Sequence, residues 1–190
     1  ILDTMKFWLE FGIDGFRLDA INFSMHDRSL KDNPARPIVD GAKATQLDFP
    51  DPYSMQWHKY DKSQPEMLPF LERMRALVDQ YPGTMLLGEV GDDDEVGCAI
   101  EYSSGGDKLH TCYNFSLIGA KPKSAEGIRN AVQTYQSRAQ GKAWPSWAFS
   151  NHDVVRAVSR WSEPYGHDPR VAKLLIAMTG CLRGSAFLYQ

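Results

Sequence analysis

The stretch at residues 13–19, IDGFRLD, alternates apolar with charged side chains, which is typical of a short β-strand. Before it, Leu2, Met5 and Leu9 recur at helical spacing, and Gly12 stands where the C-terminal cap of a helix belongs. The first unit that we predict is therefore a helix followed at once by a strand.

The same alternation of helix and strand continues along the chain. Patterning predicts strands at 85–90, 109–115, 147–150 and 186–189, and helices at 67–78, 124–135, 154–161 and 169–182. We expect a capping box of Ser63 and Glu66 to open the helix at 67–78, and the acidic run 92–95 to stabilise the start of another helix. Residues 22–62 lack periodicity, so we expect a long functional loop there.

Short strands that alternate with helices predict an α/β fold with a parallel sheet and helical crossovers. An open doubly wound sheet and a (β/α)8 barrel both satisfy this pattern. No strand is followed by the glycine-rich dinucleotide fingerprint or by a P-loop, and this favours the barrel. In such barrels the chemistry gathers at the carboxyl ends of the strands.

Composition narrows the function classes. The net charge is −3 and no run of Lys or Arg is longer than two, so we expect neither a nucleic-acid nor a membrane partner. No apolar run approaches the roughly 18 residues of a membrane span. The three cysteines contain no paired motif and are read as reduced thiols, which mildly favours a cytoplasmic location.

Carboxylates stand at the ends of three predicted strands. At the first, Arg17 and Asp19 are two residues apart and point to one face, where the guanidinium favours an ionised Asp19 suited to act as a nucleophile. A structural ion pair is the alternative. At the second, Glu89 follows apolar residues that favour its protonated form, as a general acid needs. Its alternative is the start of a solvated acidic turn.

At the third strand end, Asp153 follows His152 and precedes a predicted helix, so it is either a site residue or that helix's N-cap. No second His or Cys stands at ligand spacing, and we expect no metal and no other cofactor. Two carboxyl groups about 5 Å apart, one ionised and one protonated, are the apparatus of retaining glycoside hydrolysis. A serine hydrolase would need a nucleophile elbow, which this sequence lacks.

Three stretches carry a family resemblance: 15–23 (GFRLDAINF), 88–90 (GEV) and 149–153 (FSNHD). In order and spacing they resemble glycoside hydrolase family 13, the α-amylase family, and within it the bacterial α-glucosidase and oligo-1,6-glucosidase group. The resemblance covers essentially the whole chain and implies small oligosaccharides as substrates.

The resemblance implies roles for the site residues. Asp19 is the nucleophile that forms a covalent glucosyl-enzyme, and Arg17 orients it. Glu89 is the acid and then the base. Asp153, with His152 beside it, binds sugar hydroxyls and stabilises the transition state. A further residue, Phe115, matches an aromatic that lines the sugar pocket in similar enzymes, although a barrel-core role is an equal alternative.

The family's first motif, an Asp-x-x-x-x-Asn-His segment, is absent. We therefore interpret residues 1–190 as an internal fragment, the C-terminal part of a catalytic barrel with strands four to eight. The fragment alone is expected to be inactive, because a partial sheet cannot close.

The substrate preference rests on Ala20, which directly follows the proposed nucleophile. In similar enzymes Val at this position accompanies α-1,6 preference and Ala or Thr accompanies α-1,4, so we expect hydrolysis of maltose-like α-1,4 substrates. The alternatives are a transglycosylating relative of sucrose- or trehalose-forming type, and an oligo-1,6-glucosidase. A remote alternative is a non-catalytic amylase-like binding domain, which would have lost the carboxylates that are present here.

Overall fold

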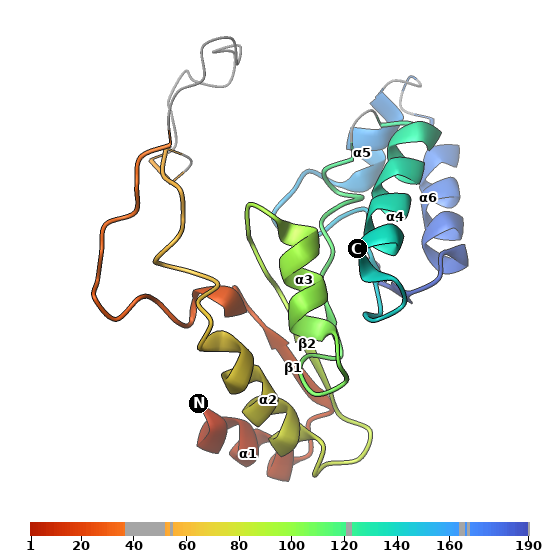
Figure 1. Cartoon of the computed structure of the whole chain (residues 1–190). Helices are drawn as coiled ribbons and strands as arrows, with labels where there is room; N and C mark the ends of the chain where they lie inside the picture. Colours follow the sequence, from red (N-terminus) through yellow and green to blue (C-terminus); the bar gives the residue numbers. More distant parts are fainter. Residues whose placement is uncertain (37–51, 54, 121–122, 164–165, 167, 190) are drawn as a thin grey trace.

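A computed structural model describes residues 1–36, 52–53, 55–120, 123–163, 166 and 168–189. In this part of the chain, helices and short strands alternate as the patterning predicts (Figure 1). The elements are α1 (Leu2–Phe11), β1 (Gly15–Leu18), the 3-10 turn η1 (Ile21–Phe23), α2 (Met67–Val78), β2 (Met85–Gly88), α3 (Glu95–Ser103), β3 (Thr111–Cys112), α4 (Ala125–Ala139), β4 (Ser146–Trp147), α5 (Ala157–Ser162), α6 (Arg170–Cys181) and β5 (Ser185–Ala186).

The strands form two parallel sheets, one of order β1-β2-β3 and one of β4-β5. Each predicted strand is present, but the ladders are shorter than the apolar runs. Between the sheets, hydroxyl groups replace a main-chain ladder: Thr111 Oγ1 donates to the carbonyl of Trp144 at 2.7 Å, and Ser146 Oγ donates to the carbonyl of Cys112 at 2.8 Å. The arrangement is a partial (β/α)8 barrel.

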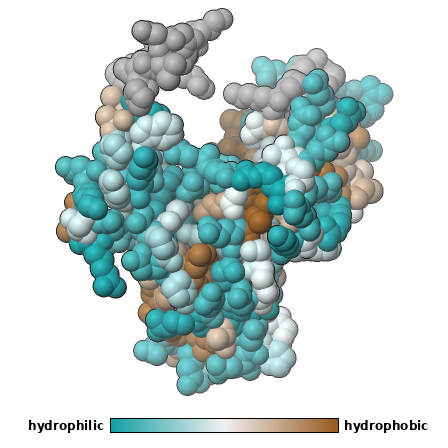
Figure 2. All heavy atoms as spheres, viewed as in Figure 1, coloured by the Kyte–Doolittle hydropathy of each residue, from teal (hydrophilic) through white to brown (hydrophobic). Residues whose placement is uncertain are grey.

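Helix packing divides the apolar interior into two clusters. Helices α1 and α2 pack against the three-stranded sheet, whose cluster includes Met74 and Leu86. Helices α4 to α6 pack around the second sheet, where Trp147 is fully buried and its ring lies edge-on to the ring of Tyr135. Figure 2 shows a mostly hydrophilic face with apolar groups gathered near its centre.

The ends of several helices agree with the sequence prediction. Gly12 caps α1 in the left-handed conformation, with a φ of 102°. Ser124 accepts a hydrogen bond from the Gly127 amide at the start of α4. Asp94, in the acidic run, accepts from the Gly97 amide at the start of α3. The two N-terminal caps satisfy amides that otherwise have no partner inside the helix, and the Gly12 amide donates to the carbonyls of Trp8 and Leu9 at the other end of α1.

Two expected helix starts are wrong. The capping box does not form, because α2 begins after Glu66 without a side-chain cap and the Ser63 hydroxyl instead donates to Asp92 at 2.5 Å. Helix α5 begins only at Ala157, because Arg156 has an extended ψ of 142°. Asp153 is therefore not its N-cap.

Candidate active site

Strand register places two acidic residues side by side. In the β1-β2 ladder Leu18 pairs with Gly88, so Asp19 and Glu89 are the next residues along two neighbouring parallel strands. The Glu89 amide donates to the Leu18 carbonyl at 2.9 Å, and the Ile21 amide returns to the Glu89 carbonyl at 3.0 Å. Main-chain hydrogen bonds therefore fix both backbones at this edge.

One guanidinium joins the two carboxyl groups. Arg17 Nη1 donates to Asp19 Oδ1, and Arg17 Nη2 lies 2.9 Å from Glu89 Oε2. The Ala20 amide also donates to Glu89 Oε2, at 3.3 Å. The Glu89 side chain, 17% exposed, thus has charged and polar partners rather than the apolar surroundings expected from its strand. The reason is that Arg17, one residue before the end of β1, reaches across the ladder.

The Arg17 guanidinium dominates the electrostatics of this pair. Its hydrogen bond, followed by the influence of the neighbouring Glu89 side chain, holds the pKa of Asp19 below its usual range. The site therefore favours the ionised form of Asp19.

The third carboxylate comes from the other sheet. His152 and Asp153 follow β4 in a loop, with His152 Nε2 3.4 Å from Asp153 Oδ1, and both side chains are more than half exposed. Within the loop, Asn151 is buried and its Oδ1 accepts from the Asp153 amide at 3.0 Å. His152 lies close enough to Asp19 to lower the pKa of that carboxyl slightly.

Tyr113 connects the two sheets and was missed by the sequence analysis. Its hydroxyl donates to the Ser150 carbonyl at 3.0 Å, and its electrostatic neighbours include Glu89 and Asp153. Burial raises the pKa of Tyr113 to about 12, so the phenol stays protonated. The available signal was its position directly after β3, at a strand end that carries no carboxylate.

Aromatic rings pack beside this tyrosine. The predicted site residue Phe115 lies edge-on to Tyr113, with ring centroids 5.0 Å apart. Phe187 lies edge-on to the same tyrosine, with ring centroids 5.9 Å apart. Phe115 is only partly buried, so it has both a core contact and a surface to offer.

Ala20 has an unusual backbone. Its φ is 42° and its ψ is 42°, in the left-handed region that residues other than glycine rarely occupy. This turn directs its amide toward Glu89 and leaves its methyl group exposed. The backbone at Ala20 thus helps to place a carboxyl oxygen.

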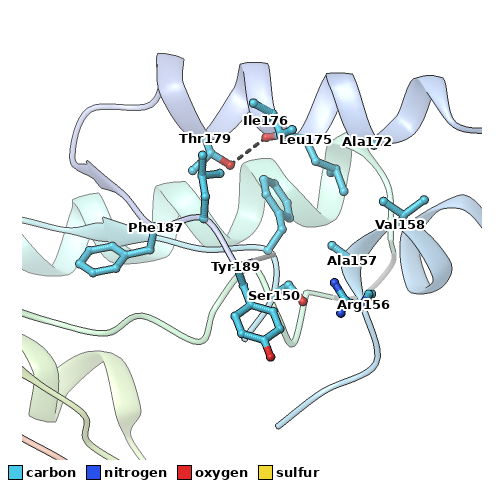
Figure 3. Close-up of a pocket in the computed structure, with 12 residues that line it drawn as sticks. Ser150, Arg156, Ala157, Val158, Ala172, Leu175, Ile176, Thr179, Phe187 and Tyr189 are labelled. Carbon is cyan, nitrogen blue, oxygen red and sulfur yellow. Dashed lines mark hydrogen bonds between the residues drawn. The ribbon is translucent and has the colours of Figure 1, made fainter. Parts of the chain in front are cut away.

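Asp19 and Asp153 lie on an open surface, whereas the Glu89 side chain is mostly buried. The Asp19 side chain is 75% exposed, because the two sheets do not close around it. A cavity of about 170 Å³ lies nearby, lined by α5, α6 and residues 187–189, with Ser150, Arg156 and Tyr189 on its wall (Figure 3). None of the three carboxylates lines it. In the described residues, no cluster of three His, Cys, Asp or Glu side chains is placed to hold a metal, and no helix is long and apolar enough to cross a membrane.

Comparison with known proteins identifies the family. The pattern described as "Alpha amylase, catalytic domain" matches residues 1–190. A probable alpha-glucosidase of Rhizobium meliloti is 44% identical over 191 residues, which cover all of this chain and 34% of the relative. An oligo-1,6-glucosidase of Halalkalibacterium halodurans is 26% identical over 203 residues, covering all of this chain and 33% of the relative.

A solved structure agrees with both the fold and the family. The crystal structure of an alpha-glucosyl transfer enzyme superimposes with a TM-score of 0.83 at 45% identity, covering the whole chain and 34% of that enzyme. The chain thus spans about a third of the length of the curated relatives that it matches.

Proposed function

Because the chain belongs to the alpha-amylase catalytic-domain family, we propose that it carries the catalytic carboxylates of a retaining α-glucosidase. The observation that carries this proposal is the Arg17 guanidinium, which holds Asp19 and Glu89 together at neighbouring strand ends. Retaining hydrolysis needs two carboxyl groups this close, because the nucleophile and the acid act on adjacent atoms of one glycosidic bond.

In the first step, ionised Asp19 attacks the anomeric carbon and the bond to the leaving sugar breaks. Glu89 gives its proton to the departing oxygen, so the leaving sugar departs as a neutral hydroxyl compound. Arg17 keeps Asp19 ionised and aligned. The result is a covalent glucosyl-enzyme.

In the second step, Glu89 takes a proton from water, whose oxygen attacks the anomeric carbon and releases Asp19. Both steps pass through an oxocarbenium-like transition state. In our proposal Asp153 binds sugar hydroxyls and stabilises this state, with His152 beside it and the ring of Phe115 bordering the sugar. Tyr113, between the sheets, keeps Asp153 near the pair.

The proposed substrates are maltose-like α-1,4 oligosaccharides. Ala20 has only a methyl group beside the scissile bond, which leaves the acceptor side open for an α-1,4 linkage. A Val side chain there, which accompanies α-1,6 preference in similar enzymes, would narrow that side and favour the more flexible α-1,6 linkage.

A second candidate is glucosyl transfer, in which a sugar hydroxyl replaces water in the second step. The 45% identity to an alpha-glucosyl transfer enzyme favours this candidate, and the 44% identity to a probable alpha-glucosidase favours hydrolysis. Both reactions share the covalent intermediate and differ only in the acceptor.

We also propose that residues 1–190 form strands four to eight of a longer barrel. The support is the length of the relatives, of which the chain covers about a third, together with two sheets that do not close on each other. Experiments on activity therefore use the full-length protein that contains this chain.

The stereochemistry of the first product tests the proposal. The full-length protein is mixed with p-nitrophenyl α-glucoside in an NMR tube, and the anomeric proton of the released glucose is followed before mutarotation. We expect α-glucose to appear first, and its loss in Asp19→Asn. Asp14→Asn, at the amino end of the same strand, is the matched control and should keep activity. Initial β-glucose, or an Asp19→Asn variant as active as wild type, would contradict the proposal.

A further inference from the structure

Helix α5 carries a guanidinium that bonds only carbonyls among the described residues. Arg160 Nε donates to the Val155 carbonyl at 2.6 Å, Nη2 to the Phe149 carbonyl at 2.6 Å and Nη1 to the Ile118 carbonyl at 3.0 Å. No carboxylate in the described part of the chain forms an ion pair with it. Burial lowers the pKa of Arg160, as expected for a charge held by neutral dipoles.

The three carbonyls belong to two segments that contain predicted site residues. Phe149 and Val155 flank the loop that contains His152 and Asp153, so one guanidinium closes this loop at both ends. The third carbonyl, from Ile118, belongs to the segment after β3 that also contains Phe115. A planar fork with five donors can serve three acceptors at once, whereas a lysine ammonium has no such fixed geometry.

The loop is further fixed at its start and at its tip. The Phe149 ring packs edge-on against Trp161, the residue after Arg160, with ring centroids 5.2 Å apart. Inside the loop, Asn151 bonds the Asp153 amide. Two consecutive residues of α5 thus hold the start of the loop, and Asn151 sets the backbone at its tip.

We propose that Arg160 is a positioning residue for Asp153, which holds the carboxylate against the sugar through the loop 149–155. This inference rests on the proposed function, because it assigns to Asp153 a contact with the substrate. Arg160 itself touches no substrate. Without it, three carbonyls lose their donor and the loop is free to shift, and a shift of about 1 Å at a catalytic group lowers the rate by roughly 100-fold.

A double-mutant cycle separates positioning from mere stability. In the full-length protein, kcat and KM for p-nitrophenyl α-glucoside are measured for wild type, Arg160→Ala, Asp153→Asn and the double variant. We expect Arg160→Ala to lower kcat by about 10- to 100-fold in wild type but by less than about threefold in Asp153→Asn. Arg170→Ala, which removes an exposed guanidinium that bonds Asp168, is the matched control and should keep activity.

Chemical rescue gives a second measurement. Added guanidinium at millimolar concentration should restore part of kcat in Arg160→Ala with saturation, whereas neutral urea, of similar shape, should not. If Arg160→Ala does not fold, Arg160→Lys replaces it in the cycle, and an intermediate loss is expected because the charge stays and the fork is gone.

The outcomes distinguish the inference from the function beneath it. A wild-type protein without α-glucosidase activity would contradict the proposed function. Active wild type with a weakened but measurable Asp153→Asn, combined with equal fold losses from the Arg160 substitution in both backgrounds, would overturn the positioning role alone. An Arg160 variant with unchanged kcat would do the same.

Discussion

Asp19 and Glu89 are held by a main-chain ladder and one shared guanidinium, whereas Asp153 lies in a loop whose position is fixed by side-chain hydrogen bonds. In the first region the backbone positions are fixed, because strand register sets the spacing of the two carboxyl groups. In the second, the position depends on Asn151, Tyr113 and Arg160, each of which can be removed without breaking a strand.

Because of this difference, substitutions in the two regions should have different effects on catalysis and folding. Changes at the ladder should act on the chemistry itself or on folding. Changes around the loop should weaken transition-state stabilisation in a graded way, because several hydrogen bonds share the task.

The largest effect should come from Glu89, the proposed acid. Glu89→Gln is expected to lower kcat/KM for maltose by about 10²- to 10⁴-fold, since the leaving sugar then receives no proton. With p-nitrophenyl α-glucoside, whose leaving group needs no proton, bond cleavage should be far less impaired. A stopped-flow comparison of both substrates checks this, and equal losses would argue against an acid role.

Folding of the two sheets offers the next comparison. Gly15 and Gly184 have φ values of 142° and 144°, and an added Cβ at Gly15 would lie 2.1 Å from the Met85 carbonyl oxygen. At Gly184 its closest neighbours, at 2.7 Å, are the Pro145 carbonyl oxygen and the indole of Trp147. We expect Gly15→Ala to destabilise folding by about 3 kcal/mol and Gly184→Ala by somewhat less, because the indole can move in part.

Urea unfolding of the full-length variants measures both changes. Gly83→Ala is a control for backbone strain alone, since its φ is 84° and no atom lies within 4 Å of an added Cβ. A Gly15→Ala variant no less stable than Gly83→Ala would show that the close approach of β1 and β2 is relaxed in solution.

Linkage preference gives a smaller effect. Ala20→Val should shift the ratio of kcat/KM toward isomaltose over maltose by about 1–2 kcal/mol. Since Ala20 has a φ of 42°, a branched residue there is also strained, and both activities should fall. Ala20→Thr introduces the same branching and the same backbone strain. A shift in linkage preference that occurs in both variants would therefore be due to side-chain shape, whereas a shift in Ala20→Val alone would be due to the added apolar group. A wild-type protein that prefers isomaltose would contradict the α-1,4 assignment.

The hydroxyl of Tyr113 should lower the activation free energy of the reaction by about 1 kcal/mol, the net value of one hydrogen bond. Tyr113→Phe removes the bond to the Ser150 carbonyl and keeps the ring contact with Phe115. We expect kcat to fall about fivefold with the melting temperature nearly unchanged. Full activity in this variant would show that the loop is held without the bond between the sheets.

The smallest effect is a displacement along the pH axis. Arg17 keeps the pKa of Asp19 below its usual range, so this proposed nucleophile stays ionised as the pH falls. Arg17→Lys retains a charge but loses the fork, which should raise the pKa of Asp19 and move the acidic limb of the kcat/KM profile to higher pH. A limb that stays in place or moves to lower pH would show that Arg17 does not set this ionisation.

Local patterns were sufficient for much of this molecule. The alternation at residues 15–18 predicted β1, and the parallel α/β class followed from the order of elements. Caps at Gly12, Asp94 and Ser124 were readable because a cap involves residues only a few positions apart. The capping box at Ser63 was wrong because Asp92, 29 residues away, competes for the same hydroxyl.

The sequence by itself determined which residue types stand at the strand ends: Arg17 and Asp19, Glu89, and Asp153. Only the tertiary structure decided what surrounds them. Glu89 meets a guanidinium instead of an apolar wall, Tyr113 reaches Ser150 across 37 residues, and Arg160 reaches Ile118 across 42. The physical reason is that periodicity and capping arise from contacts between near neighbours, whereas a side chain that bonds a distant carbonyl leaves no repeating pattern in the sequence.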